Sequence, residues 1–317
     1  MIKPRLFASK CLGFAACRWD GVTIRDAFVE SLKPYVEYVT TCPEVEAGLG
    51  VPRDPIRIVS QSGEFHLVQP STGKDMSSEM KSFAGHFLGS LGDIDGFILK
   101  DRSPSCGIDS VKVYPKIGPS ASVARASGFF GAAVLERFGD MPIETEGRLT
   151  NYRIREHFLT RIFTFAGFRG VKEAGRMGAL VDFHARNKLL IMSYSQKGLS
   201  ILGSLTANRD GLKQDKVFDE YEKCLHNTMA RISRYTANIN ILTHSLGYFK
   251  DKLSADEKKF FLALVTEYRD GKVPLSVPVN VAKSYIVRFG EAYLARQTFF
   301  EPYPPGLVSI TDSGAGR

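Results

Sequence analysis

Short apolar runs of strand length alternate with stretches of helical periodicity over the first 150 residues of the chain. Three of the apolar runs end just before a loop that contains a cysteine, and glycine or proline marks the turns between elements. Such an alternation is typical of an α/β domain with a parallel sheet, in which ligands gather at the carboxyl ends of the strands. We therefore expect a Rossmann-like α/β fold whose reactive loops lie at one edge of the sheet. The predicted strands are residues 4–9, 35–40 and 96–100, and the predicted helices are residues 23–32, 77–91 and 123–138.

Long helical periods replace this alternation beyond residue 150, and β-branched runs become rarer. We expect a domain boundary near residue 150, a linker over residues 151–171 that includes a helix and a basic connector, and a mainly α-helical bundle over residues 172–317. The predicted helices of this second domain are residues 178–208, 216–246, 254–270 and 279–296.

The composition is that of an ordinary globular protein. With 317 residues, 44% of them apolar and 24% charged, the chain is long enough for two domains. It contains no apolar run of about 18 residues, the length typical of a spanning helix, so we expect no membrane partner. The N-terminal residues lack the apolar stretch of a secretion signal, which predicts a cytoplasmic protein.

The positive charge is concentrated in the second half of the chain. The whole sequence has 42 Lys and Arg against 34 Asp and Glu, whereas residues 1–150 contain 17 against 18. Residues 151–317 therefore carry a net charge of +9. Such a half fits a polyanion partner, because binding to phosphates is driven largely by counterion release. A basic helical surface without any such partner is the alternative, and the charge alone does not decide between the two.

The cysteines point to metal or catalytic chemistry. An odd number in a chain without an export signal argues against a disulfide framework. All but one lie in the first third of the sequence. The five are Cys11, Cys17, Cys42, Cys106 and Cys224.

Three short segments place a cysteine beside glycine or proline, in loops whose backbone amides can point at a bound cluster: residues 11–21 (CLGFAACRWDG), 41–53 (TCPEVEAGLGVPR) and 100–107 (KDRSPSCG). Thiolates are soft ligands that suit iron–sulfur clusters or zinc. Structural zinc usually needs four ligands in closely spaced pairs, and an electron-transfer ferredoxin needs a close cysteine run, neither of which is present. Spacing alone leaves a three-cysteine site beside the alternative of buried core cysteines.

The combination C-L-G…C-R-W-D-G, C-P-E…G-L…P-R and S-P-S-C-G closely resembles the thiouracil desulfidase (TudS-like) family over about residues 5–145. The later segments LVDFHARNKLLIMSYSQ and LGSLTAN resemble the helical domain of YbgA-like two-domain proteins. The resemblance therefore implies an iron–sulfur desulfidase domain fused to a helical domain, and it assigns no role to the latter.

For the site, the resemblance implies a [4Fe–4S] cluster that is held by Cys11, Cys42 and Cys106. It implies Glu44 as the catalytic acid/base and Ser103 as the active-site serine, with Ser105 as the second choice. The substrates that it implies are thiouracil or 4-thiouridine monophosphate, which would lose sulfur without net redox change to give uracil or UMP and hydrosulfide.

This chemistry is consistent with the residues. Three thiolates leave one iron open as a thiophilic Lewis acid for the substrate sulfur. Glu44 would activate the attacking water, and Ser103 or Ser105 would bind or protonate the ring. The competing function is an iron–sulfur sensor, or a module that binds RNA or protein through the basic helical domain. We expect a small thio-nucleobase or thio-nucleotide as partner first and RNA second, with a homo-oligomer as a further alternative.

For several other residues the sequence supports two alternative roles each. Cys17 is a structural thiol or a further ligand, and Arg18 pairs with Asp20 or shapes the substrate pocket. Arg53 and Lys100 are phosphate contacts or surface charges. In the second domain, His184 and Lys188 share one helix face, which is either solvated or functional.

Overall fold

The computed structural model describes residues 2–209 and 211–311, and the chain divides into two compact units. The main part of the first is Lys3–Phe158, and that of the second is Leu159–Ile310. The division falls inside α4 (Tyr152–Ala174), one continuous helix over the residues for which the sequence predicts a helix-containing linker. The predicted domain boundary near residue 150, with a linker over residues 151–171, therefore stays a prediction.

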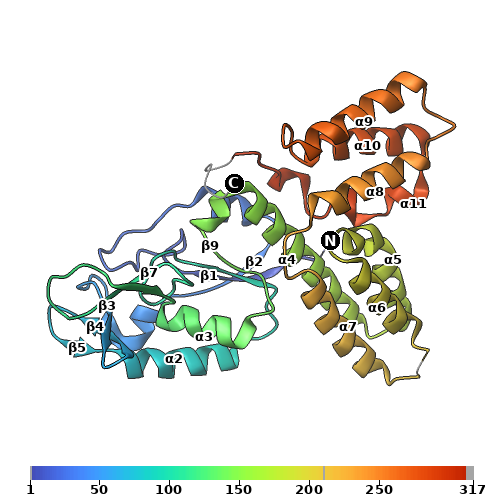
Figure 1. The fold of residues 1–317 in the computed structure, drawn as a ribbon. Coiled ribbons are helices and arrows are strands. Elements are labelled where there is room, and N and C mark those ends of the chain that lie inside the picture. Colours follow the sequence, from blue (N-terminus) through green and yellow to red (C-terminus); the bar gives the residue numbers. More distant parts are fainter. Residues whose placement is uncertain (1, 210, 312–317) are drawn as a thin grey trace. The chain divides into compact units, whose positions relative to one another are not determined.

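A parallel sheet with the strand order β2-β1-β6-β9 forms the centre of the first unit (Figure 1). The chain runs from β1 to β2 on one side and returns to β6 on the other, so the direction of winding reverses at β1. Ligands of open α/β sheets bind at such a switch point, outside the carboxyl ends of the strands. The predicted α/β fold is confirmed. The strands are β1 (Arg5–Ser9), β2 (Glu37–Thr41), β6 (Gly96–Leu99) and β9 (Ile143–Thr145).

Aromatic packing holds this sheet to its helices. Phe7 of β1 and Phe97 of β6 are fully buried with ring centroids 5.7 Å apart. Phe130 of α3 lies 5.4 Å from Phe7, and Phe87 of α2 lies 5.8 Å from it. Figure 1 shows α2 and α3 side by side. Each buried phenyl ring contributes about 1.5–3 kcal/mol, so this cluster fixes the strands whose ends carry the site. The helices of this unit are α1 (Ala27–Leu32), α2 (Ser77–Ser90) and α3 (Phe129–Phe138).

A second, mixed sheet with the order β5-β4-β3-β7-β8 was not predicted. Its last strand shows that the predicted helix 123–138 is wrong at its start, because residues 124–126 pair antiparallel with β7 and the helix begins only after Gly128. The predicted helix 23–32 also begins later, since the Asp26 side chain accepts a hydrogen bond from Val29 N and caps α1 there. The strands are β3 (Arg57–Gln61), β4 (Glu64–Gln69), β5 (Lys74–Asp75), β7 (Val111–Tyr114) and β8 (Ala124–Ala126).

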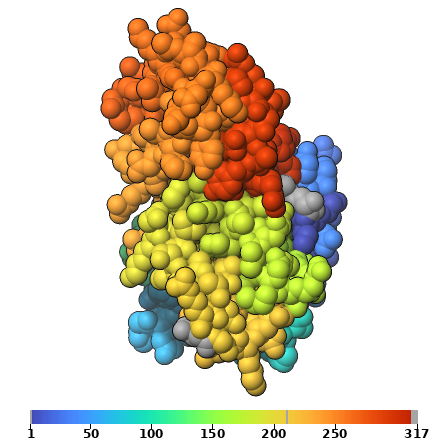
Figure 2. Space-filling model, turned by 90° about the vertical axis from the view of Figure 1, so that its right-hand side faces the viewer, coloured from blue at the N-terminus to red at the C-terminus, as the bar shows by residue number. Residues whose placement is uncertain are grey.

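The second unit is helical, as predicted. Three of its predicted helices, 178–208, 216–246 and 279–296, are each divided into two helices in the structure. In the first of them Ser195 is extended and its hydroxyl accepts from Gly198 N, which ends one helix and caps the next. Figure 2 shows the earlier helices in yellow-green beside the later ones in orange and red. None of the described helices combines the length and the apolar content needed to cross a membrane. The helices are α5 (Met177–Tyr194), α6 (Gln196–Ala207), α7 (Gln214–Thr228), α8 (Tyr235–Gly247), α9 (Ala255–Arg269), α10 (Ser276–Phe289) and α11 (Ala292–Ala295).

His184 is half-buried and contacts the interior of this unit. Its Nδ1 lies 3.0 Å from the hydroxyl of the fully buried Tyr221, whose ring stacks on Phe168 at 5.1 Å. Burial and the nearby Lys188 ammonium lower the pKa of His184, which favours the neutral ring. The contact is therefore part of the packing between α5 and α7.

Candidate functional site

The predicted cysteine ligands meet at the carboxyl ends of three neighbouring strands. Cys11 follows β1, Cys42 follows β2 and Cys106 lies in the loop after β6. All three line one cavity of about 350 Å³, and Cys17 lines it as well. Cys224 lies in α7 of the second unit and is not among the residues that line the cavity.

The environment of these thiols opposes their ionisation. Burial, followed by the nearby Cys106, Cys17 and Cys42, raises the pKa of Cys11 far above its ordinary value. Burial likewise raises the pKa of Cys106 to about 12, with the Glu44 carboxylate adding to the effect and a hydrogen bond with Ser9 opposing it. Several buried thiols that disfavour each other's negative charge are suited to a shared cationic partner, such as the iron of a cluster.

Hydrogen-bond donors lie beside two of the sulfur atoms. Arg53 Nη2 is 3.9 Å from Cys42 Sγ, and Ser105 Oγ is 3.8 Å from Cys106 Sγ. Donors in these positions are typical of sulfur atoms that ligate iron. Among the described residues, no group of three or more His, Cys, Asp or Glu forms a site for a single metal ion. The soft thiols that line the cavity and the donors beside Cys42 and Cys106 are of the kinds that hold an iron–sulfur cluster, and the identity of such a group belongs to the proposal below.

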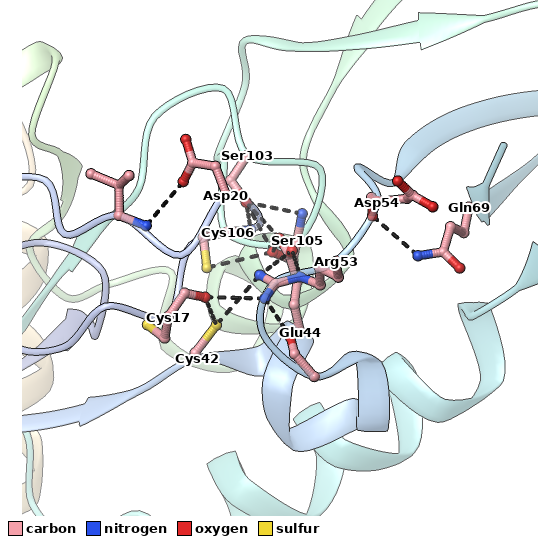
Figure 3. A network of polar contacts seen from close by, with 12 residues as sticks. Cys17, Asp20, Cys42, Glu44, Arg53, Asp54, Gln69, Ser103, Ser105 and Cys106 are labelled. Atoms are coloured by element: carbon pink, nitrogen blue, oxygen red, sulfur yellow. Dashed lines mark hydrogen bonds and ion pairs between the residues drawn. The ribbon is translucent and has the colours of Figure 1, made fainter. Parts of the chain in front are cut away.

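Glu44 lies between a buried arginine and a serine (Figure 3). Its Oε2 accepts hydrogen bonds from Arg53 Nη2 at 2.6 Å and Nε at 2.9 Å. Its Oε1 accepts from Ser105 Oγ at 2.7 Å, whereas Ser103 Oγ lies at 3.5 Å. The two oxygens therefore have separate partners. Glu44 directly precedes a π-helical turn at Val45–Leu49 and follows Cys42 by two positions.

The two serines have different surroundings. Ser105 is 1% exposed and reaches both Glu44 and the sulfur of Cys106. Ser103 is half-buried, and its hydroxyl accepts from the backbone N–H groups of Ser105 at 3.3 Å and Cys106 at 3.1 Å. Ser103 thereby closes the turn that presents Cys106, while Ser105 has the closer contact with the carboxylate. The sequence ranks these serines in the opposite order.

The loop that carries Cys106 rests on the N-terminus of α3. Gly128 N donates to Gly107 O at 2.8 Å, and Gly131 N donates to Ser105 O at 2.9 Å. A Cβ atom at Gly131 would overlap Gly107 O and lie 2.8 Å from Cys106 O. Glycine is therefore needed for this close approach, and the loop carbonyls satisfy N–H groups that the first turn of a helix leaves unpaired. The G-F-F-G segment was the available sequence signal, and sequence reasoning missed it.

Both predicted phosphate contacts have other partners. The Arg53 side chain is 3% exposed and also donates to the carbonyls of Cys17 at 3.1 Å and Gly50 at 2.8 Å, so it is not a surface charge. Lys100 pairs with Glu146, the residue after β9, at the same end of the parallel sheet. The interpretation of Arg53 as a surface charge is therefore wrong, whereas a phosphate contact by either residue stays a prediction, because both line the cavity beside their carboxylate partners.

The rim of the cavity carries other cations and an exposed aromatic ring. Trp19 is 42% exposed, with the Arg18 guanidinium 5.5 Å from its ring centroid. Arg18 in turn pairs with Asp20 at 2.7 Å. Lys10 and Arg102 line the same cavity, and Arg102 has φ of +56° with a side chain that is 80% exposed. A bulky residue in this left-handed conformation is unusual, and its strain is often associated with function.

Comparison with known proteins places each half of the chain. A family model described as 2-thiouracil desulfurase matches residues 6–146, and one described as a protein of unknown function, DUF1722, matches residues 188–304.

Two relatives have similar sequences. The uncharacterized protein YbgA of Escherichia coli (strain K12) is 30% identical over 167 residues, which cover 51% of this chain and 96% of the relative. The uncharacterized protein YbbK of Bacillus subtilis (strain 168) is 30% identical over 109 residues, which cover 32% of this chain and 72% of the relative.

One solved structure is also similar in sequence. It is the [4Fe-4S]-dependent thiouracil desulfidase TudS, which is 31% identical and covers 46% of this chain and 93% of its own. The TM-score of that comparison is 0.37, too low for the superposition to place individual residues.

Proposed function

Because this chain belongs to the 2-thiouracil desulfurase family through residues 6–146 and to the DUF1722 family through residues 188–304, we propose that it is an iron–sulfur enzyme that removes sulfur from a thiolated uracil compound. The observation that carries the proposal is the meeting of Cys11, Cys42 and Cys106 with Glu44 at one cavity. A cavity of about 350 Å³ is within the usual range for small-ligand sites, roughly 300–1,000 Å³.

The proposed cofactor is a [4Fe–4S] cluster held by Cys11, Cys42 and Cys106. When bound, it supplies a thiophilic Lewis acid at the iron without a protein ligand. Support comes from the burial of the thiols, from their origin in three neighbouring strand ends, and from the donors beside Cys42 and Cys106. Cys17 has no ligand role in this proposal, because the three ligands are Cys11, Cys42 and Cys106. All five cysteines are free thiols, which suits the reducing cytoplasm that we propose as the location.

Glu44 is the proposed general base. The thiocarbonyl carbon exchanges sulfur for the oxygen of water, so the thio-base and water become the oxo-base and hydrogen sulfide with no net electron transfer. Glu44 takes a proton from the water and returns it to the departing sulfur or the ring. Ser105 Oγ donates its single proton to Glu44 Oε1 at 2.7 Å while the carboxylate is charged. Once Glu44 has taken a proton from water, the hydroxyl is free to donate to the ring as negative charge develops.

The rim supports a substrate that carries phosphate. Lys10, Arg18 and Arg102 provide positive charge at the opening, and the exposed Trp19 offers a flat surface for stacking. Stacking of a base on an aromatic ring contributes about 1–3 kcal/mol. We therefore place 4-thiouridine monophosphate ahead of free thiouracil. RNA that contains a thiolated uridine shares the same chemistry and stays the second candidate, favoured by the +9 charge of residues 151–317.

A substrate panel tests the proposal. The full chain, reconstituted with iron and sulfide without oxygen, is incubated with 2-thiouracil, 4-thiouracil, 4-thiouridine, its 5′-monophosphate and a short RNA that contains 4-thiouridine. Sulfide release and loss of the thiocarbonyl absorbance are measured. We expect the highest kcat/KM for the monophosphate. Turnover of the RNA alone would promote the second candidate, and no release from any compound would favour an iron–sulfur sensor.

A further inference from the structure

Arg53 joins the proposed base to a proposed cluster ligand. One guanidinium touches Glu44 through Nε and Nη2, and Nη2 also lies 3.9 Å from Cys42 Sγ. The same side chain donates through Nη1 to the carbonyls of Cys17 and Gly50. Figure 3 shows the contacts of Arg53 with Glu44, Cys17 and Cys42.

The charge of Arg53 is buried, so its partners are needed. At 3% exposure its side chain cannot be solvated by bulk water, and a buried charge requires pairing and hydrogen bonds. Its carboxylate partner is Glu44, whose side chain is 12% exposed. Removing either partner would leave the other charge in a poorly solvated place, so each of the two stabilises the other.

The geometry of the pair orients Glu44. Both nitrogen donors engage Oε2, at 2.9 and 2.6 Å, rather than one on each oxygen as in a parallel fork. Oε1 is thereby directed to Ser105, on the other side of the carboxylate. An unanchored glutamate rotates about three side-chain bonds, and a misplacement of about 1 Å can cost about 10²-fold in rate.

The contact with sulfur gives Arg53 a second effect. Hydrogen bonds and positive charge beside a ligand sulfur stabilise the reduced, more negative form of an iron–sulfur cluster and so raise its reduction potential. Arg53 Nη2 is a charged donor within reach of Cys42 Sγ. One side chain therefore contacts both the base and a ligand.

We propose that Arg53 is a positioning residue for desulfuration, which holds Glu44 by Oε2 and at the same time donates to the sulfur of Cys42. The part that concerns Glu44 rests on the proposed function, whereas the part that concerns Cys42 needs only a bound cluster. A merely structural arginine would instead tie the loops at Cys17 and Gly50 together and affect turnover only through folding.

A double-mutant cycle tests the first part. Arg53→Met, Glu44→Gln and the double variant are prepared as reconstituted full chains, with Arg125→Met as control, because Arg125 lies on β8 and its guanidinium donates to Ser110 O, away from the cavity. We expect Arg53→Met to lower kcat by about 10²-fold while KM changes by less than about threefold. In the Glu44→Gln background the same change should cost little more, because the base it positions is already gone. Multiplicative losses in the double variant would overturn the positioning role.

The reduction potential of the cluster tests the second part. We expect Arg53→Met to lower the potential and Arg125→Met to leave it unchanged, in titrations followed by electron paramagnetic resonance. An unchanged potential in Arg53→Met would overturn the contact with Cys42. This readout holds even if the wild-type chain releases no sulfide, so failure of the proposed function is distinguished from failure of the inference.

Arg53→Lys keeps the experiment decisive if Arg53→Met does not fold. Lysine retains the charge but lacks the planar donor pair. We expect cluster content and thermal stability near those of the wild type, a partly restored potential and a kcat that remains low. Full recovery of kcat with lysine would show that charge alone suffices and would overturn orientation by the two donors.

Discussion

Ser105 Oγ donates a 2.7 Å hydrogen bond to Glu44 Oε1, although the two residues are 61 positions apart in the chain. Glu44 follows β2 and Ser105 follows β6, the two strands that flank β1. Strand order therefore creates the contact, and the same order brings Cys42 and Cys106 to one cavity. Glu44, Ser105 and the thiols of Cys42 and Cys106 thus share one end of the sheet.

Loss of any proposed ligand should abolish the stable cluster. We expect Cys11→Ser, Cys42→Ser and Cys106→Ser to remain colourless after anaerobic reconstitution, because a hard hydroxyl replaces a soft thiolate in a set of three. Cys17→Ser and Cys224→Ser should keep iron content near the wild-type value. Iron and sulfide analysis with absorption spectra provides the measurement. Full cluster content in one of the first three variants would remove that cysteine from the set.

Glu44→Gln should retain the cluster and lose turnover. The amide keeps the size of the side chain but cannot accept a proton from water, so kcat is expected to fall by about 10²–10⁴-fold. Iron content, measured on the same preparation, separates lost chemistry from lost cofactor. Near-normal turnover would assign proton transfer to a group other than Glu44.

The two serines should differ in what they lose. Ser105→Ala removes the hydroxyl beside Glu44 Oε1 and should lower kcat by about 10²–10³-fold with the cluster retained. Ser103→Ala removes the acceptor for Cys106 N and should chiefly shorten the lifetime of the cluster under a chelator. Chelation kinetics and steady-state rates distinguish the two. The reverse pattern would restore the order that the sequence favours.

Much of this site was predictable because each apolar strand is short and ends at a turn. The runs before Cys11, Cys42 and Cys106 have strand length, and parallel strands bring their ends together. Which carboxylate would neutralise Arg53 was not predictable. That pairing depends on the π-helical turn and on the path of the chain back to the cavity, and neither is encoded in local periodicity.

The missed elements have similar causes. β8 has only three residues and pairs with β7 in a sheet that includes exposed, polar strands. Three residues are too few to show the alternation of a strand, so the helical period of the following α3 was extended over them. The break at Ser195 depends on one hydroxyl that caps α6. The apolar residues on both sides of Ser195 follow a helical period, so the sequence pattern predicted a single helix there.

Gly131 provides a test of how the Cys106 loop is held. Alanine there would overlap Gly107 O, so we expect Gly131→Ala to destabilise the first unit by about 1–3 kcal/mol and to weaken cluster retention. Gly85→Ala is the matched control: Gly85 lies in α2, where an added Cβ atom would meet no neighbouring group within 4 Å, and alanine should be neutral or stabilising by up to about 1 kcal/mol. Chemical denaturation of both provides the measurement. Equal stability of the two variants would contradict the close approach.

Arg102 should distinguish nucleotide from free base. Its side chain lines the cavity and is 80% exposed, so Arg102→Ala should raise KM for 4-thiouridine monophosphate by about tenfold or more, through loss of a charged contact, and leave KM for 4-thiouracil unchanged. Lys112→Ala, an exposed cation on β7 that does not line the cavity, is the control. Equal effects of Arg102→Ala on both substrates would place its role in the loop rather than at a phosphate.

The helical half should account for any affinity of the protein for polyanions, because residues 151–317 carry a net charge of +9 while residues 1–150 are close to neutral. A chain that ends at Phe158 keeps the main part of the first unit, including Arg155, which donates to the carbonyls of Leu149 and Thr150. Any affinity of the full chain for a short RNA should fall steeply with salt, and the shortened chain should lose it. A chain that ends at residue 150 should be less soluble than either. RNA binding that survives truncation, or that salt does not weaken, would contradict this division of roles.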